Sequence, residues 1–221
     1  MNKYEYVLFD LDGTISESAM GVRKSIEYTL KKFGKDIPDL SDYTVYVGPP
    51  IYDTFKNYCK FDVSEIEDAV NTFRDYYNRE GKLLNKLYDG MDELLRQLKE
   101  NGVKIAVCSS KYEKFAYEVV DILGISQYFD AICGSSPDKS RQDKVELIPY
   151  AITLLGGKIE NDRKKTVMIG DTVFDAKGAN LCGVDFIGAE YGYGDKKQML
   201  SEGAKAFVKT PMEILPLIIE I

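Results

Sequence analysis

The stretch YVLFDLDGT, residues 6–14, decides which fold this chain of 221 residues is expected to adopt. Its first four residues are apolar or aromatic, as in a short strand buried in a sheet. If the extended geometry continues past Phe9, Asp10 and Asp12 point to the same side, and Gly13 permits a tight turn after them. Ligands of doubly wound α/β sheets bind outside the carboxyl ends of the strands. The stretch therefore predicts two carboxylates at a ligand site, although a plain surface turn would contain the same residue types.

Further short apolar runs alternate with segments of helical period. Residues 91–101 and 115–123 carry apolar residues at three- and four-residue spacing, and each segment is followed by a glycine typical of a helix end. Strands that alternate with helices of this length predict βαβ units. The expected fold class is α/β, a doubly wound Rossmann-like parallel sheet. The later predicted strands are 104–108, 131–133, 166–169, 184–187 and 206–208.

The interval between the first two predicted strands is too long for a single crossover. Residues 22–33, 51–58 and 66–77 show helical spacing of apolar residues, and the irregular segment 46–50 contains two consecutive prolines that interrupt any helix. We therefore expect a small helical cap domain, residues 16–87. The expected catalytic core domain consists of residues 1–15 and 88–221.

The strand predicted at 166–169 ends much as the first one does. It runs into Gly170-Asp171, and Asp175 follows four residues later. Both carboxylates are candidates for a functional site. A carboxylate in this position often only caps the following helix, so a structural role for each stays open.

A hydroxyl and an amine complete the set of candidates. The strand predicted at 104–108 is followed by Ser109-Ser110-Lys111, where hydroxyls and backbone N–H groups at a helix start can cradle an anion. Lys144 stands at the start of a helical run, where a lysine is usually a solvated surface residue.

The composition excludes several kinds of chemistry. The absence of histidine removes serine- and cysteine-histidine nucleophile pairs and histidine-ligated zinc sites. The four cysteines are widely spaced, which is typical neither of a zinc site nor of a disulfide framework. With 36 acidic and 29 basic residues the net charge is −7, which argues against binding of a nucleic acid polymer.

Taken together, the motifs Asp-x-Asp-Gly-Thr, Ser, Lys and Gly-Asp-x-x-x-Asp at successive strand ends resemble the haloacid-dehalogenase superfamily across essentially the whole chain. The loop Gly48-Pro49-Pro50-Ile51 and the stretch from Gly134 to Lys144 are similar to the phosphoglycolate phosphatase and 5′-nucleotidase-like branch. Ser109-Ser110-Lys111 replaces the Thr-Asn-Lys that relatives show more often, and it keeps the hydroxyl.

The resemblance implies a magnesium-dependent phosphatase that hydrolyses a small phosphate monoester: a nucleotide, phosphoglycolate or a sugar phosphate. Asp10 would be the nucleophile that forms an aspartyl-phosphate, and Asp12 the general acid and base. The side chains of Asp10 and Asp171 and the backbone carbonyl of Asp12 would bind Mg²⁺, which prefers oxygen ligands.

Supporting roles follow from the same resemblance. Ser109, Ser110, Lys144 and Gly13 would bind the phosphoryl group, and Thr14 and Asp175 would support the metal ligands. In the cap, Tyr46, Gly48, Pro49 and Tyr52 would contact the rest of the substrate, whereas the other cap tyrosines are expected to be core.

Two alternatives stay open: a sugar-phosphate mutase of the same superfamily and a non-catalytic phospho-acceptor module. The expected partner is a small phosphorylated metabolite, with no nucleic acid polymer and no membrane. A polar N-terminus that runs straight into the first strand predicts a cytoplasmic protein without a secretory signal. The oligomeric state is expected to be a monomer or a homodimer.

Overall fold

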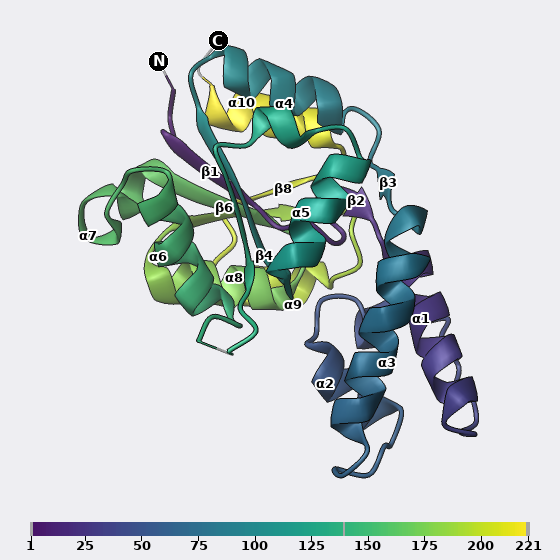
Figure 1. Cartoon of the computed structure of the whole chain (residues 1–221). Helices are drawn as coiled ribbons and strands as arrows, with labels where there is room; N and C mark the ends of the chain where they lie inside the picture. The colour runs from purple at the N-terminus through teal and green to yellow at the C-terminus, as the bar shows by residue number, and fades with distance from the viewer. Residues whose placement is uncertain (1, 139, 220–221) are drawn as a thin grey trace.

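A computed structural model describes residues 2–138 and 140–219. Its centre is a six-stranded, all-parallel sheet with the strand order β5-β4-β1-β6-β7-β8 (Figure 1). The strands are β1 (Tyr6–Phe9), β4 (Lys104–Tyr112), β5 (Ala131–Ser135), β6 (Thr166–Gly170), β7 (Asp185–Ala189) and β8 (Ala206–Val208). The sheet confirms the predicted α/β class.

Helices cover both faces of this sheet because side chains alternate along each strand. Val7 and Phe9 of β1 belong to one hydrophobic cluster, whereas Leu8 belongs to the other. Helices α4, α5 and α10 pack on the first face and α6, α8 and α9 on the second (Figure 1). Their bounds are α4 (Met91–Glu100), α5 (Glu113–Ile122), α6 (Lys144–Leu154), α8 (Val173–Cys182), α9 (Lys196–Ser201) and α10 (Leu215–Ile218), and the short α7 (Ile159–Asp162) follows α6.

A helical segment leaves the sheet after β1 and returns before α4. We call residues 18–85 the helical insert. Its long helices α1 (Ala19–Lys32) and α3 (Ile66–Arg79) pack side by side (Figure 1), and α2 (Ile51–Asp53) packs on α3. Apolar residues of these helices form a third hydrophobic cluster, which Phe115 of α5 joins from the core.

The insert is joined to the core by two adjacent strands. The antiparallel strands β2 (Ser16–Glu17) and β3 (Lys86–Leu87) pair Ser16 with Leu87 and Glu17 with Lys86. They lie at the two ends of the insert, close to the limits predicted for the cap domain. The division into two domains at these limits stays a prediction.

Three details differ from the sequence-based expectation. The end predicted for the second strand at Cys108 is wrong, because β4 continues to Tyr112 through a bulge and pairs Tyr112 with Ser135. The predicted helix at 51–58 is α-helical only to Asp53 and continues as a π-helical turn over Thr54–Tyr58. The two-residue strands β2 and β3 were not predicted, since two residues carry no periodicity.

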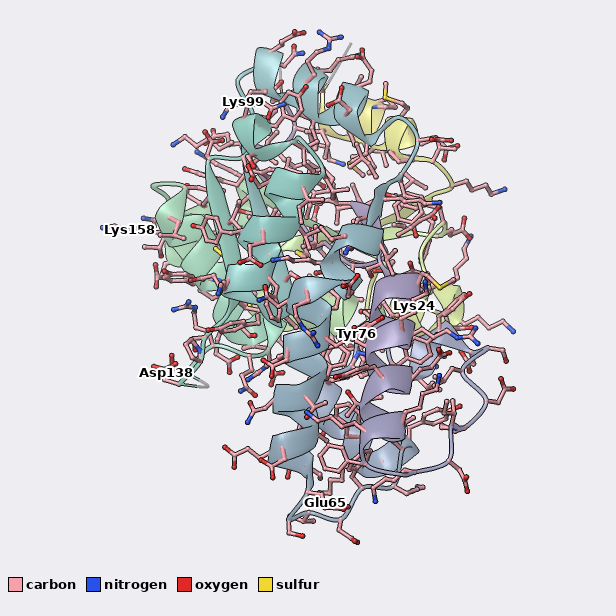
Figure 2. All side chains as sticks on the ribbon, turned by 45° about the vertical axis from the view of Figure 1, so that its right-hand side comes forward. Lys24, Glu65, Tyr76, Lys99, Asp138 and Lys158 are labelled. Carbon is pink, nitrogen blue, oxygen red and sulfur yellow. The ribbon has the colours of Figure 1, made fainter. Side chains whose placement is uncertain are left out.

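Charged side chains lie on the surface of both the insert and the core. Lys24 on α1 and Lys158 before α7 are exposed, and Lys158 lies at the edge of the molecule in Figure 2. Among the described residues, no helix has both the length and the apolar character needed to cross a membrane.

The contact between α1 and the short 3₁₀ helix Gly81–Leu84 yields a test of the insert. A Cβ on Gly21 would lie 2.2 Å from the carbonyl oxygen of Gly81. Gly→Ala in a helix normally stabilises by up to about 1 kcal/mol. Here we expect Gly21→Ala to destabilise by about 1–3 kcal/mol, because overpacking forces the helices apart.

Urea unfolding of the purified parent and of Gly21→Ala measures the difference between their free energies of unfolding. Met20→Ala on the same helix is the matched control, since Met20 is 47% exposed, and its free energy of unfolding should change by less than about 0.5 kcal/mol. A Gly21→Ala variant more stable than the parent would contradict this close packing.

Candidate active site

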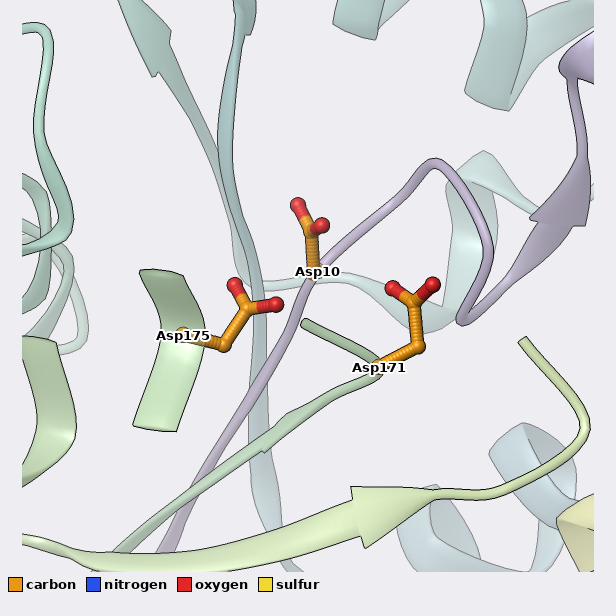
Figure 3. Close-up of side chains that lie close together, drawn as sticks. All are labelled: Asp10, Asp171 and Asp175. Atoms are coloured by element: carbon orange, nitrogen blue, oxygen red, sulfur yellow. The ribbon is translucent and has the colours of Figure 1, made fainter. Parts of the chain in front are cut away.

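Three carboxylates meet at the carboxyl end of the sheet. Oxygens of Asp10, Asp171 and Asp175 all lie within 4.8 Å of one another, and all three residues are buried (Figure 3). Strand pairing brings them together: Phe9 of β1 is in register with Ile169 of β6, and the Asp10 N–H donates to the Ile169 carbonyl at 2.8 Å. Asp171 follows the end of β6, and Asp175 lies in the first turn of α8.

Lys144 supplies the positive charge of this cluster. Its Nζ lies 2.9 Å from Asp10 Oδ1 and 2.6 Å from Asp175 Oδ1, and it donates to the Cys108 carbonyl at 2.6 Å. Only 4% of Lys144 is exposed. The solvated surface lysine that was the alternative for this position is therefore excluded.

The shared burial shifts the protonation equilibria of the cluster. Burial raises the pKa of Asp10 to about 6, against the lowering effect of Lys144. Burial, with the charges of Asp175 and Asp10, holds the pKa of Asp171 well above its usual range. Burial alone would lower the pKa of Lys144, but the two carboxylates outweigh it and raise that pKa, so the ammonium stays charged. The cluster thus combines three carboxyl groups with one ammonium group.

Asp175 has two roles that the sequence left as alternatives. Its Oδ2 accepts hydrogen bonds from the backbone N–H and the hydroxyl of Thr172, at 3.0 and 2.7 Å, and so caps α8. Its other oxygen contacts Lys144. Asp175 thereby fixes Lys144 relative to the helix.

Neutral donors orient Asp171. The Thr14 hydroxyl donates to Oδ1 at 3.1 Å, and the backbone N–H of Tyr193 donates to Oδ2 at 2.8 Å. Gly13 has φ +83°, and a Cβ there would lie 2.2 Å from Asp171 Oδ2. The Asp-Gly-Thr turn can pass this close to the carboxylate only because residue 13 is glycine. Tyr193 was not identified from the sequence, where only its glycine-rich surroundings mark a loop.

Asp12 is held by a lysine that sequence reasoning left without a role. Lys111 Nζ donates to both carboxylate oxygens of Asp12, at 3.0 and 2.9 Å. Lys111 stands directly after the two predicted phosphate-binding serines, and this adjacency was the signal available in the sequence.

Asp10, Asp12, Ser109, Ser110 and Lys144 line one cavity of about 630 Å³. Ser109 is buried and its Oγ accepts a hydrogen bond from the Lys111 N–H at 3.3 Å, whereas Ser110 is half-buried. The predicted phosphate-binding hydroxyls therefore lie in the same cavity as the predicted nucleophile. Gly13 and Thr14 lie against Asp171.

The helical insert supplies the other wall of this cavity. Tyr46, Gly48, Pro49 and Tyr52 all line it. Tyr52 is 40% exposed. Tyr46 is buried within the insert's cluster, and its hydroxyl donates to the Leu40 carbonyl at 3.0 Å, so it also serves as core. A contact of these residues with substrate stays a prediction.

The carboxylate cluster is suited to a divalent metal ion. It offers hard oxygen donors from three carboxyl groups, against which the described residues set the single ammonium group of Lys144. Asp10 Oδ1 and Asp175 Oδ1 both contact the ammonium of Lys144 and have no hydrogen-bond partner among the described residues. Asp10 and Asp171 could therefore ligate a metal, with Asp175 beside them.

Comparisons with known proteins agree with this arrangement. The family pattern described as haloacid dehalogenase-like hydrolase matches residues 7–189. A Pseudomonas aeruginosa protein named 5′-nucleotidase is 34% identical over 197 residues, which is 89% of this chain and 87% of the relative. A crystal structure described as a predicted phosphatase from Clostridium acetobutylicum has a TM-score of 0.90 and 38% identity, with 99% of both chains covered.

A third relative carries a different kind of name. The Mycobacterium tuberculosis protein named tyrosine-protein kinase PtkA is 36% identical over 191 residues, which is 86% of this chain and 63% of that protein. The match of the family pattern to most of the chain, together with these relatives, confirms the resemblance seen in the motifs. The chain belongs to the haloacid dehalogenase-like hydrolase family.

Proposed function

We propose that the protein hydrolyses a small phosphate monoester in a magnesium-dependent reaction, through an aspartyl-phosphate on Asp10. One observation carries the proposal: Asp10 lines the cavity with one oxygen against Lys144 and lies beside Asp171 and Asp175. A carboxylate nucleophile splits one difficult displacement into two easier steps.

In the first step an Asp10 oxygen attacks phosphorus. The bond from phosphorus to the ester oxygen breaks, and its electron pair goes to that oxygen, which takes a proton from Asp12. Asp12 lines the same cavity two residues beyond the nucleophile. The products are an alcohol and an acyl phosphate on Asp10.

In the second step Asp12 takes a proton from water, and the water oxygen attacks phosphorus. The bond from phosphorus to the Asp10 oxygen breaks, which restores the carboxylate and releases inorganic phosphate. Lys144 and the serine hydroxyls would hold the other phosphoryl oxygens, since a fixed ammonium reduces the repulsion between the Asp10 carboxylate and the phosphate.

Asp10 and Asp171 would hold Mg²⁺, with the Asp12 backbone carbonyl as a further ligand. When bound, the ion would neutralise charge on the phosphoryl oxygens.

The relatives' names support phosphate monoesters as the substrate class. The relative named 5′-nucleotidase makes nucleoside 5′-monophosphates the first compounds to test, followed by phosphoglycolate and sugar phosphates. The assay measures free phosphate and substrate together. Loss of substrate without free phosphate would instead indicate transfer to another acceptor, as in a mutase.

Removal of the nucleophile tests the covalent route. Asp10→Asn should lower kcat by at least about 10³-fold, because the amide keeps the shape of the side chain but does not attack phosphorus. Phosphate release measures the loss, and urea unfolding checks that the variant is folded. The exposed α3 carboxylate offers the control Asp68→Asn, which should keep full activity. Retention of more than trace activity by Asp10→Asn would contradict the aspartyl-phosphate.

Metal replacement tests the carboxylate cluster. Activity should vanish with EDTA and return with Mg²⁺ but not with Ca²⁺, whose larger and more variable oxygen shell suits the cluster less well. Excess Mg²⁺ should also raise the melting temperature of the parent, as any ligand specific to the folded state does. Asp171→Asn should lose most of that rise. Full activity in Ca²⁺ alone would contradict the magnesium assignment.

Tyr52 tests the role of the insert in specificity. Tyr52→Ala should lower kcat/KM about 10-fold for the preferred substrate, because an aromatic contact with the leaving group contributes on the order of 1 kcal/mol. For p-nitrophenyl phosphate kcat/KM should fall less than about 3-fold, because this generic ester lacks the leaving group that the contact recognises. The control is Leu83→Ala, an exposed apolar residue of the insert outside the cavity lining. Equal losses on both substrates would mean that Tyr52 only supports the insert.

A further inference from the structure

Lys111 forms a partly buried ion pair that the proposed reaction does not use. Its side chain is 8% exposed and that of Asp12 is 15% exposed. Both carboxylate oxygens of Asp12 accept from the same ammonium group, and the partners are 99 residues apart along the chain. Such a pair needs close geometry to offset the desolvation of both charges.

We propose that Lys111 is a positioning residue for Asp12, and that Tyr77 of the helical insert holds Lys111 in place. The proposal rests on the function proposed above, in which Asp12 is the general acid and base. Its new element is a contact through which the insert determines where the Asp12 carboxylate lies.

The positioning of Asp12 by Lys111 is supported by the geometry at Asp12. A general acid must come within about 2.6–3.2 Å of the oxygen that it protonates. Two contacts with one ammonium restrict rotation of the Asp12 carboxylate about its last torsion, which is otherwise broad.

The role of Tyr77 in holding Lys111 is supported by contacts between Lys111 and the insert. Lys111 Nζ lies 4.5 Å from the ring centroid of Tyr77, which is in α3 and fully buried. The Tyr77 hydroxyl accepts from Asn85 Nδ2 at 3.1 Å, and Asn85 Oδ1 accepts from the Ser16 hydroxyl at 3.2 Å. Ser16 belongs to β2. A continuous series of contacts thus runs from Asp12 through Lys111 and the insert to the strands that join insert and core.

The backbone of β4 explains how Lys111 reaches this position. The strand continues past Cys108 through its bulge, and the Lys111 N–H donates to Ser109 Oγ. Bulges re-aim side chains next to active sites. A strand ending at Cys108 would not fix residue 111 relative to Asp12.

The test compares two leaving groups. p-Nitrophenolate departs with little protonation, whereas an alkoxide needs the general acid, which contributes on the order of 10²-fold or more. Lys111→Met should therefore lower kcat/KM about 10²-fold for the best alkyl phosphate of the substrate panel and less than about 3-fold for p-nitrophenyl phosphate. Lys111→Arg should restore part of the loss. Tyr77→Leu should show the same selectivity with a smaller loss.

A double variant shows whether Lys111 acts through Asp12. In the Asp12→Asn background, Lys111→Met should change kcat/KM for the alkyl phosphate less than about 3-fold, since coupled residues are not additive. This double variant leaves no unpaired buried charge, so it keeps the test usable if Lys111→Met alone unfolds. Lys114→Met, which removes an exposed lysine three residues away, is the control and should match the parent.

The outcomes separate the two proposals. A parent protein that hydrolyses neither ester would overturn the proposed function. A parent that hydrolyses both, with equal losses in Lys111→Met or an undiminished loss in the Asp12→Asn background, would overturn only the positioning role.

Discussion

Burial of three carboxyl groups beside a single ammonium group is the constraint on which the rest of the site depends. Asp10 and Asp175 share one ammonium group, that of Lys144, whereas Asp171 is contacted by the neutral donors of Thr14 and Tyr193. Burial of an unbalanced ion costs several kcal/mol even after relaxation. The cluster is therefore most stable with a further cation beside it. In the proposed reaction, binding of a metal ion and binding of an anionic phosphoryl group would therefore depend on each other.

The parallel sheet brings these charged residues together without distorting the backbone. β1 and β6 are adjacent and in register, so residues that follow them meet without any long side chain having to reach across. The first turn of α8 and the start of α6 deliver Asp175 and Lys144 to the same edge. Most of the backbone there is hydrogen-bonded within regular elements, which leaves the polar side chains free to satisfy one another.

Sequence patterns predicted features formed by residues close together in the chain, and they missed contacts between residues far apart in it. The strand-end residues Asp10 and Asp171 and the helical periods of α4 and α3 were identifiable because an apolar run of fixed period marks its own end. The Lys111–Asp12 pair has no such marker, since its partners are 99 residues apart and meet only in the tertiary structure. Tyr46 illustrates a second limit: a tyrosine fits a core or a cavity wall equally well, and here it lines the cavity from within the core.

The paired strands β2 and β3 have a further consequence for how the chain is assembled. Because Ser16 and Leu87 are partners in the same ladder, residues 18–85 form a closed loop whose two ends lie about 5 Å apart. The entropy of closing such a loop grows only with the logarithm of its length, so a longer or shorter insert costs the sheet very little. The insert thus connects the paired strands β2 and β3 in the way that the loop of a β-hairpin connects its two strands. The stability of the core should therefore depend only weakly on the length of the insert that lines the candidate site, which leaves room for inserts of different length on the same sheet.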